Sequence, residues 1–273
     1  MCVCTFMVTW QRVNHFPGTY LLGRKDNMAR VCNKFRRTFG AENFEYFPKT
    51  FICPGDRAEL LADEEECKTK AKKGEVPMWI VKPPAGCKGI GIRLVTDPST
   101  QIKERAIVVV SRYIDNPLLI NQTKFDLRLY VAVTSFNPLR VYIHEHGLGR
   151  FCTVKYTNKA RKNRFRHLTN YSLNKNNPEF KRAEGDADDE GHKWSARAVW
   201  AHLEKQGVDT GPIKDKIDGI PRLIVSRRVC VGVVCARWQE QMIGRRVLLA
   251  PLCCLLLRRL YLCGERRDLV GQT

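Results

Sequence analysis

A glycine-rich segment between two short apolar runs places the strongest constraint on the fold of this chain. Residues 79–92 read WIVKPPAGCKGIGI, and the runs MWIVK and GIRLVTD on either side of the glycines have the composition of β-strands. The segment therefore predicts a loop that joins two strands. Dinucleotide-binding and P-loop patterns place a phosphate at the start of a helix instead, and neither pattern is spelled here.

The same glycines indicate what the loop contacts. Glycine permits positive φ and a close approach of the backbone to another group, and Lys82 and Lys88 lie beside the glycines. These features predict an anionic ligand such as a phosphate. A β-hairpin turn whose lysines are solvated is the alternative, and the segment alone does not decide between the two.

Composition and charge limit the class of protein and of partner. The 273 residues are 44% hydrophobic and 27% charged, as in a globular, soluble chain, and the net charge of +19 favours a polyanionic partner. Charge alone does not distinguish nucleic acid, an anionic membrane and an acidic protein surface. The 12 cysteines include no C-x-x-C pair and no signal peptide precedes them, which predicts reduced thiols in a cytosolic chain without structural zinc. The apolar stretch 247–257 is too short to span a membrane and predicts a buried or sticky helix.

Hydrophobic spacing predicts the main elements. Residues 27–40 carry apolar side chains at helical spacing and end at a glycine, and the charged residues 61–77 predict an exposed helix that leads to a boundary near Gly74. Residues 106–114 predict a buried strand. Residues 186–207 predict a helix with an acidic start and a glycine stop.

One run alternates almost perfectly between apolar and polar residues. In residues 124–133, KFDLRLYVAV, the charged residues Lys124, Asp126 and Arg128 share one face, which taken alone predicts the wet face of an antiparallel sheet. Residues 140–151 predict a strand that returns beside it, and residues 167–175, HLTNYSLNK, taken alone predict a polar turn. The HEH triplet within the returning strand is explained better by exposure than by a metal site, which would need further ligands.

The order of these segments resembles the tubulin tyrosine ligase-like family. It comprises the Lys-Pro-glycine loop and then SRYI, KFDLRLYV, GLGRF and HLTNYS, with VNHFPG and GRKD before them and GHKW after them. The resemblance runs from about Arg12 to Ile224 and is closest to the glutamate-adding members, the tubulin polyglutamylases. It implies an α/β (α+β) ATP-grasp fold, in which the nucleotide lies between two subdomains built on antiparallel sheets. Accordingly we expect a partial N-terminal subdomain (1–75), a central subdomain with the phosphate loop (76–120), a C-terminal subdomain (121–224) that is incomplete, and a non-matching tail (225–273).

The resemblance implies a role for individual residues in nucleotide binding. Lys82 would meet a phosphate under a flexible cover, the Ser111–Ile114 stretch would receive adenine through backbone groups, and Arg128 would stabilise the phosphates or the acyl phosphate. Arg128 and Lys88 are the catalytic candidates. The implied ATP-binding residues are Lys82, Lys88, Gly89, Ile90, Gly91, Ser111, Arg112, Tyr113, Ile114, Lys124, Asp126, and, on a second nucleotide-contacting strand, His167, Thr169 and Asn170.

The implied reaction joins free L-glutamate to a glutamate side chain of tubulin at the expense of ATP, through an acyl phosphate. Arg150, Ser172 and Lys193 would hold the free glutamate, because a guanidinium fork suits a carboxylate. The positive charge then has a partner in the acidic C-terminal tails of tubulin. Neither nucleic acid nor membrane is implied, and the chain is expected to be a monomer in the cytoplasm, on microtubules, including those of cilia and basal bodies.

The sequence departs from the family pattern at three places. Lys88 replaces the usual arginine, and Ser111 stands where glutamine is common. In addition, no Glu-x-Asn follows Ile224, where the family carries its magnesium ligands. The resemblance therefore implies ATP and magnesium as cofactors, although the sequence contains no recognisable ligands for the metal. Two alternatives therefore stay open. One is a non-catalytic member that binds nucleotide or acidic tubulin tails without ligation, and the other is an ATP-grasp ligase that acts on a small metabolite.

Overall fold

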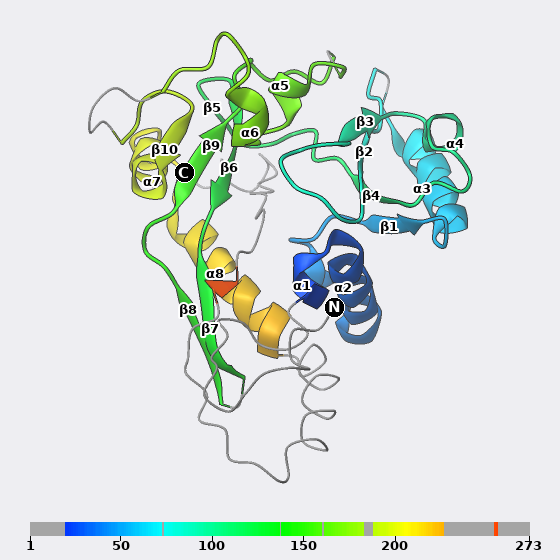
Figure 1. Ribbon diagram of the computed structural model, residues 1–273, viewed down its shortest axis with the longest axis horizontal. Helices are drawn as coiled ribbons and strands as arrows, with labels where there is room; N and C mark the ends of the chain where they lie inside the picture. The colour runs from blue at the N-terminus through cyan, green and yellow to red at the C-terminus, as the bar shows by residue number, and fades with distance from the viewer. Residues whose placement is uncertain are drawn as a thin grey trace, which may run out of the picture.

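The computed structural model describes residues 20–226, except 73, 137, 160 and 183–187, together with residues 254–255. The described residues form two bodies that face each other, each built on an antiparallel sheet, with a long bent ribbon extending from the second body (Figure 1). The early motif VNHFPG and nearly all of the predicted tail lie outside these residues.

The helices and strands follow the order that the sequence predicts in the first half of the chain. The helical segments are α1 (Tyr20–Gly23), α2 (Lys25–Phe39), a 3-10 turn (Glu42–Phe44), α3 (Arg57–Lys70), α4 (Pro98–Gln101), α5 (Arg164–His167), α6 (Tyr171–Asn174), α7 (Ala196–Lys205) and α8 (Gly211–Ser226). The strands are β1 (Thr50–Cys53), β2 (Trp79–Lys82), β3 (Arg93–Val95), β4 (Val108–Arg112), β5 (Leu119–Ile120), β6 (Thr123–Arg128), β7 (Val131–Phe136), β8 (Leu139–Ile143), β9 (Leu148–Phe151), β10 (Lys193–Ser195) and β11 (Cys254–Leu255).

The first sheet has the strand order β1-β4-β2-β3, with each pair antiparallel. β2 and β3 pair with Ile80 opposite Leu94, so the glycine segment joins two strands and the predicted hairpin is confirmed. Successive side chains in a strand point to opposite faces. One face, including Trp79 and Val81, packs against Leu60 of α3, and all three side chains are buried.

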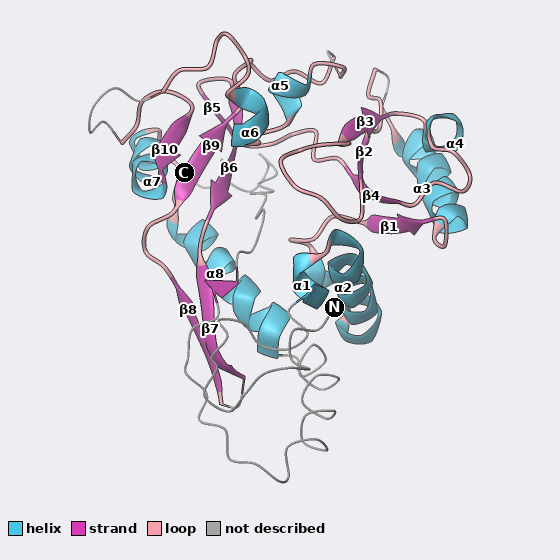
Figure 2. Cartoon of the chain, viewed as in Figure 1, coloured by secondary structure: helices cyan, strands magenta, loops and turns pink. Residues whose placement is uncertain are grey.

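The opposite face of this sheet is turned toward the second body. Ile80 and Ile92 pack there against Leu168, which lies just after α5. Figure 2 shows α5 and α6 on the side of the second sheet that faces β2 and β3. This apolar contact connects the first sheet to the second body.

α2 is confirmed as the amphipathic helix that the sequence predicts. It ends at Phe39, and Gly40 follows with φ +91°, a conformation that favours glycine. Cys32 and Phe35 are buried on its apolar face. Most of α3 is exposed, as its charge predicts, but one side of the helix is buried and includes Asp63 and Glu64 as well as Leu60. Both carboxylates accept hydrogen bonds, Asp63 from Arg112 and Trp79 and Glu64 from Ser99, which offset the cost of burial.

The second sheet has the order β10-β9-β6-β5, and β7 pairs with β8 and β11 in a separate ribbon. The strand predicted over residues 140–151 is therefore two strands, β8 beside β7 and β9 beside β6. The break falls near Gly147, where a Cβ would lie 2.7 Å from the carbonyl oxygen of Arg128. Because the chain passes so close to the end of β6, the ladder is interrupted there.

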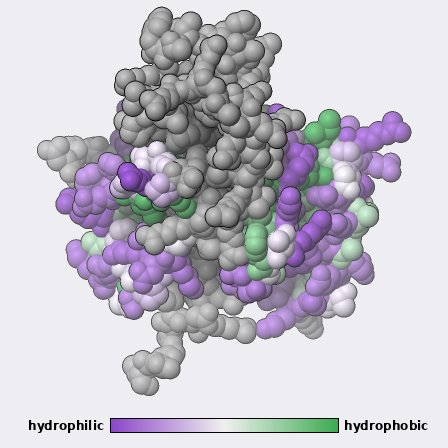
Figure 3. Space-filling model, turned by 90° about the horizontal axis from the view of Figure 1, so that it is seen from below, coloured by the Kyte–Doolittle hydropathy of each residue, from purple (hydrophilic) through white to green (hydrophobic). Residues whose placement is uncertain are grey.

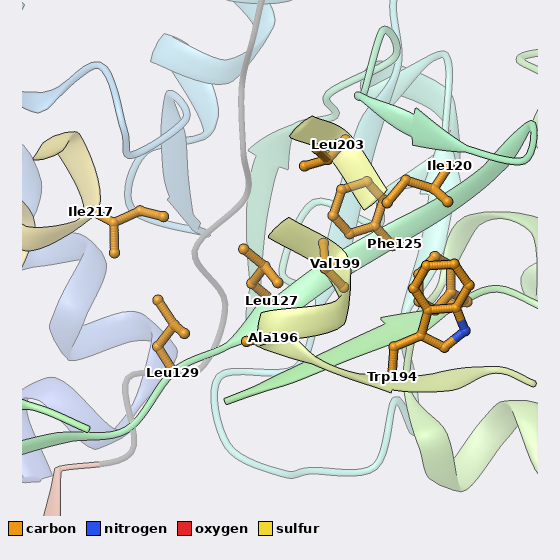
Figure 4. Packing of buried hydrophobic residues seen from close by; sticks show 10 residues of the cluster. Ile120, Phe125, Leu127, Leu129, Trp194, Ala196, Val199, Leu203 and Ile217 are labelled. Carbon is orange, nitrogen blue, oxygen red and sulfur yellow. The ribbon is translucent and has the colours of Figure 1, made fainter. Parts of the chain in front are cut away.

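The core of the second body joins β6, β9 and α7 (Figure 4). Leu127 of β6 packs with Val199 and Leu203 of α7, and each such buried side chain contributes roughly 1.5–3 kcal/mol. The helix predicted from residue 186 begins only at Ala196. The physical reason is the cap at Ser195, whose Oγ accepts a hydrogen bond from the backbone N–H of Ala198, while the residue before it lies in β10.

Two segments near the end of the chain differ from the sequence interpretation. α8 was not predicted, and of residues 247–257 the structure describes only Cys254–Leu255, which form β11 and not a helix. No helix in the described ranges combines the length and apolarity that a membrane span requires. On the face drawn in Figure 3, the described side chains are mostly hydrophilic and the apolar ones form small separate groups. The thiols of Cys53, Cys67 and Cys87 are free.

Candidate active site

The candidate active site lies where the open face of the first sheet meets β6 and the chain around α5. Lys82 and Ser111 reach it from the first sheet, Lys124 and Asp126 from β6, and His167 from the end of α5. Tyr113, which follows β4, joins the two bodies through its contacts with Lys124 and His167. The sequence interpretation assigned all five to nucleotide binding.

Lys124 is buried, although alternation alone predicts a wet face for it. Lys124 is 2% exposed, and Asp126 on the same face of the strand is 3% exposed. The Lys124 ammonium donates to the Tyr113 hydroxyl at 2.8 Å and lies 4.2 Å from the centroid of that ring and 5.7 Å from the centroid of Tyr156. Aromatic faces and a hydroxyl thus replace part of the water around this cation.

Tyr113 also contacts His167. Its hydroxyl lies 3.0 Å from Nδ1 of His167, and the two rings meet edge to face. An ammonium can only donate, so the hydroxyl of Tyr113 accepts from Lys124. The hydrogen-bonded row Lys124–Tyr113–His167 therefore links β6, the end of β4 and α5.

Asp126 and Arg150 form a buried ion pair between neighbouring strands. They are register partners on β6 and β9, Nε of Arg150 donates to Oδ1 of Asp126 at 3.1 Å, and a second contact joins Nη2 to Oδ2. The carboxylate is fully buried, whereas the guanidinium is 15% exposed. Lys193 lies directly opposite Arg150 on β10. The structure thus brings together two of the three residues assigned to free glutamate, while Ser172, the third, lies on α6.

The hairpin loop is held against α5. The carbonyl oxygen of Gly89 accepts from Arg164 at 2.7 Å, and a Cβ on Gly89 would lie 3.2 Å from the side chain of Asn170. Gly89 has φ +80°, and the exposed Lys88 before it has φ +61°, an uncommon conformation for a lysine. Ile90 is 71% exposed at the tip. The carbonyl oxygen of Gly86 also accepts from Lys25 at 2.8 Å, so the loop is held at two glycines, while Lys88 and Ile90 are exposed.

Lys82 and the predicted hinge lie at the other side of the site. Lys82 Nζ is 3.4 Å from Oγ of Ser111, which also accepts from Thr50 at 3.0 Å. Ser111 and Arg112 lie at the end of β4, and Tyr113 and Ile114 follow it. The Arg112 side chain is directed to Asp63, and its backbone N–H donates to the carbonyl oxygen of Lys49 at 2.9 Å.

Asp63 anchors this hinge from the far face of the sheet. Its carboxylate accepts hydrogen bonds from two nitrogens of Arg112, at 3.0 and 2.6 Å, and from the indole N–H of Trp79 at 3.2 Å. It also forms an ion pair with Lys49 at 2.6 Å. Burial by itself would raise the pKa of this carboxyl, but the hydrogen bonds from Arg112 and Lys49 outweigh it and hold the pKa below its ordinary value.

The segment that contains HLTN is not a strand. His167 ends α5, and Thr169 and Asn170 lie in the connection to α6. Asn174 holds this connection in place, because its Nδ2 donates to the carbonyl oxygens of Leu168 and Asn170 at 2.7 and 3.1 Å. These side-chain bonds take the place of the strand ladder that the family resemblance implied.

Sequence reasoning missed several residues that shape the site. Asn174 also accepts from the backbone and hydroxyl of Thr153, and Tyr156 donates to the carbonyl oxygen of Asp115 at 2.7 Å. Burial raises the pKa of Tyr156 to about 12, so it is neutral beside Lys124. Asn174 and Tyr156 carry no signal in a single sequence beyond their polar character, since their partners are distant along the chain.

The described residues include groups of the kind that bind phosphate. Lys82, Lys124 and the loop offer cations and backbone groups to phosphates, which is the donor set that such a ligand requires. Within the described ranges, no group of three or more His, Cys, Asp or Glu side chains is placed to hold a metal ion. Asp126 is already paired with Arg150.

Comparisons with known proteins identify the family. The family model described as the tubulin-tyrosine ligase family matches residues 5–237. The chain belongs to the tubulin-tyrosine ligase family. The match begins before Arg12 and continues past Ile224, so it is longer than the motifs alone indicate. The mixed α/β architecture with antiparallel sheets agrees with the predicted ATP-grasp fold of this family.

Individual relatives are named as glutamylases. The chain is 42% identical over 219 residues to the human protein named tubulin monoglutamylase TTLL4, and 40% identical over 229 residues to human tubulin polyglutamylase TTLL5. These alignments cover 79% and 82% of this chain but only 18% and 17% of the relatives. Tubulin polyglutamylase ttll-4 of Caenorhabditis elegans is 41% identical over 212 residues, which cover 77% of this chain and 33% of the relative. The chain therefore spans a minor part of the length of these curated relatives.

Proposed function

We propose that this chain is an ATP-dependent ligase that adds glutamate to glutamate side chains of tubulin. The observation that carries the proposal is that Lys82 contacts Ser111 while Lys124, from the second sheet, contacts Tyr113 two residues further on, in a chain of the tubulin-tyrosine ligase family. The names of the relatives support glutamate as the added amino acid and tubulin as the acceptor.

In the proposed reaction, ATP and free glutamate are co-substrates. A side-chain carboxylate oxygen of the acceptor attacks the γ-phosphorus of ATP, the bond to ADP breaks, and an acyl phosphate forms. The amino group of free glutamate then attacks the acyl carbon and displaces phosphate, losing a proton as the isopeptide bond forms. Both steps depend on orienting the reactants and on cations near the transferring phosphoryl group.

The residues of this chain have distinct parts in the proposal. Lys82, Lys88 and Lys124 hold and neutralise phosphates, and the segment from Ser111 to Ile114 receives the adenine. Arg128 stabilises the charge that develops on the acyl phosphate. Arg150 and Lys193, neighbours across β9 and β10, hold the carboxylates of free glutamate together with Ser172. Gly89, Ile90, Gly91, His167, Thr169 and Asn170 complete the nucleotide site. No part in these steps is assigned to a magnesium ion.

Binding without ligation is the second candidate function. The observation in its favour is that the described residues contain no cluster of metal-ligating side chains, whereas phosphoryl transfer commonly depends on magnesium. Under either function we place the chain in the cytoplasm, on microtubules.

The test is the incorporation of labelled glutamate into microtubules by the purified chain, at saturating ATP and magnesium. Incorporation that is lost in Lys82→Ala, and lost when the acidic tails are removed from the microtubules, is expected for a ligase. A folded chain that binds ATP in a direct titration but incorporates no glutamate has the second function. A folded chain that neither binds ATP nor incorporates glutamate contradicts both.

A further inference from the structure

A pocket of about 400 Å³ opens between β3 and the chain that leads into and through α5. It lies on the face of the first sheet that is turned toward the second body, because Leu94 is the register partner of Ile80. Its lining consists of Ile92, Arg93, Leu94, Thr96, Gln101, Arg161, Lys162, Arg164, His167 and Leu168.

The rim of the pocket is cationic. Arg93, Arg161, Lys162 and Arg164 all line it, and no aspartate or glutamate belongs to its lining. In a salt-bridged surface such cations would alternate with carboxylates. Several cations around one concavity, without acidic neighbours in the lining, favour an anionic ligand.

One of these cations has an unused donor. Nε of Arg161 is buried and has no hydrogen-bond partner among the described residues. Arg93 and Arg164 each use one nitrogen on a backbone carbonyl, that of Gln101 at 2.9 Å and that of Gly89 at 2.7 Å, and their planar guanidinium groups carry further donors. Guanidinium forks of this kind are suited to carboxylates.

The floor of the pocket is apolar, and one wall is an edge strand. Ile92, Leu94 and Leu168 belong to one apolar cluster, so side-chain stems can be covered while their charged ends reach the rim. β3 is the last strand in the order of its sheet, with no further strand beside it among the described residues. An extended peptide suits an edge of this kind better than a compact ion does.

The pocket differs from the nucleotide site but borders it. Of the residues that the sequence assigned to ATP, only His167 lines the pocket. The Arg164 side chain connects the two, because it lines the pocket and holds the carbonyl oxygen of Gly89 in the phosphate loop. A carboxylate bound here lies beside the loop.

We propose that this pocket, formed by β3 and residues 161–168, binds the carboxylates of an extended acidic peptide. On the proposed function, on which this reading rests, that peptide is the acceptor chain whose glutamate is modified. The pocket then selects acceptors by the acidic residues that flank the modified one.

The experiment measures peptide binding by fluorescence anisotropy at low ionic strength, with the full chain and without ATP or free glutamate. The probe is a short fluorescein-labelled peptide of alternating glutamate and glycine, and the matched peptide has glutamine in place of glutamate. The variant is the double change Arg161→Gln and Lys162→Gln. The control variant is Lys205→Gln and Lys216→Gln, which removes the same charge from exposed positions on α7 and α8.

We expect the wild-type chain to prefer the glutamate peptide and the pocket variant to bind it about ten-fold more weakly, while the control variant changes little. ATP affinity, titrated separately, stays unchanged in both variants. Equal weakening in the two variants would mean non-specific charge attraction, and no binding by the wild-type chain would mean no peptide site, so either result overturns the proposal. Loss of ATP affinity in the pocket variant would assign the pocket to nucleotide phosphates and would also overturn it. Because the assay needs no ligation, peptide binding in a chain that incorporates no glutamate leaves this inference standing while the proposed ligase activity fails.

Discussion

At the residue scale, the side chains of Lys124 and Asp63 are two buried charges that contact residues assigned to the site. Lys124 lies under the site with its ammonium against Tyr113 and Tyr156, and Asp63 holds Arg112 behind the hinge. Neither is distinguishable from a surface residue by type, since lysine and aspartate are mostly exposed in proteins. Both side chains are buried because elements far apart in the chain pack together around them. Each of the two residues supports a specific prediction.

Lys124→Met tests whether the buried cation serves ligand binding. Methionine fills a similar volume and needs no desolvation of a charge, so we expect the free energy of unfolding to change by less than about 1 kcal/mol or to rise. ATP affinity, measured by calorimetric titration, is expected to fall at least about ten-fold, because a cation near the phosphates is lost. Lys205→Met, on the exposed side of α7, is the control. Unchanged ATP affinity in Lys124→Met would remove Lys124 from the nucleotide site.

Asp63→Asn tests the pH dependence of stability. The folded-state pKa of Asp63 is depressed, so its contribution is fully present above the unfolded pKa of about 3.9 and is lost as the pH falls through the folded value. At pH 7 we expect the free energy of unfolding of the variant to be about 3 kcal/mol lower than that of the wild type. This value is at the lower end of the range for breaking a buried ion pair, because Lys49 and Arg112 are both partly exposed.

The measurement is urea unfolding of both proteins at neutral pH and at pH values below 4. The difference between wild type and Asp63→Asn should shrink as the pH falls. Glu59→Gln, which breaks an exposed contact with Arg37, is the control and should change little at any pH. A difference that stays constant down to the acid transition would argue against a depressed pKa.

At the scale of elements, the glycine loop and α2 were predictable, whereas the helix around residue 196 and the chain around His167 were not. Periodicity and composition act locally, so they identify a hairpin or an amphipathic helix wherever no distant contact intervenes. The start of α7 depends on the Ser195 cap and on the pairing of the preceding residues with β9, which spacing does not reveal. The HLTN segment is held by Asn174 across a turn.

Gly89→Ala tests whether the close approach of the loop to Asn170 matters for binding. The new methyl group would meet Asn170 at 3.2 Å in a conformation with φ +80°. We expect about 1 kcal/mol of lost stability from the backbone and a several-fold lower ATP affinity, because the loop is displaced from α5. Gly74→Ala is a matched control, since Gly74 has φ +91° and nothing within 4 Å of its Cβ position. A similar loss of ATP affinity in both variants would mean that the contact with Asn170 is unimportant.

At the scale of the whole molecule, the net charge of +19 predicts that association with the proposed acceptor, the acidic tails of tubulin, is sensitive to salt. In co-sedimentation with microtubules, the apparent Kd is expected to rise more than about ten-fold between roughly 50 and 200 mM salt. Microtubules without their acidic tails are the control, and they should bind weakly at every salt concentration. Salt-independent binding, or equal binding to tail-less microtubules, would contradict this prediction.

The sequence by itself determined the hairpin around the glycine loop, the amphipathic helix α2, the sign of the charge and, through the order of its motifs, the family. A short glycine loop between β runs favours a hairpin, and an excess of lysine and arginine favours an anionic partner wherever those residues lie. Only the tertiary structure decided which charges are buried and which surround a pocket. Lys124 and Arg161 are both basic residues in the sequence, yet one lies beneath Tyr113 and the other lines the β3 pocket. Burial and proximity arise from contacts between residues far apart in the chain, and neither spacing nor composition contains that information.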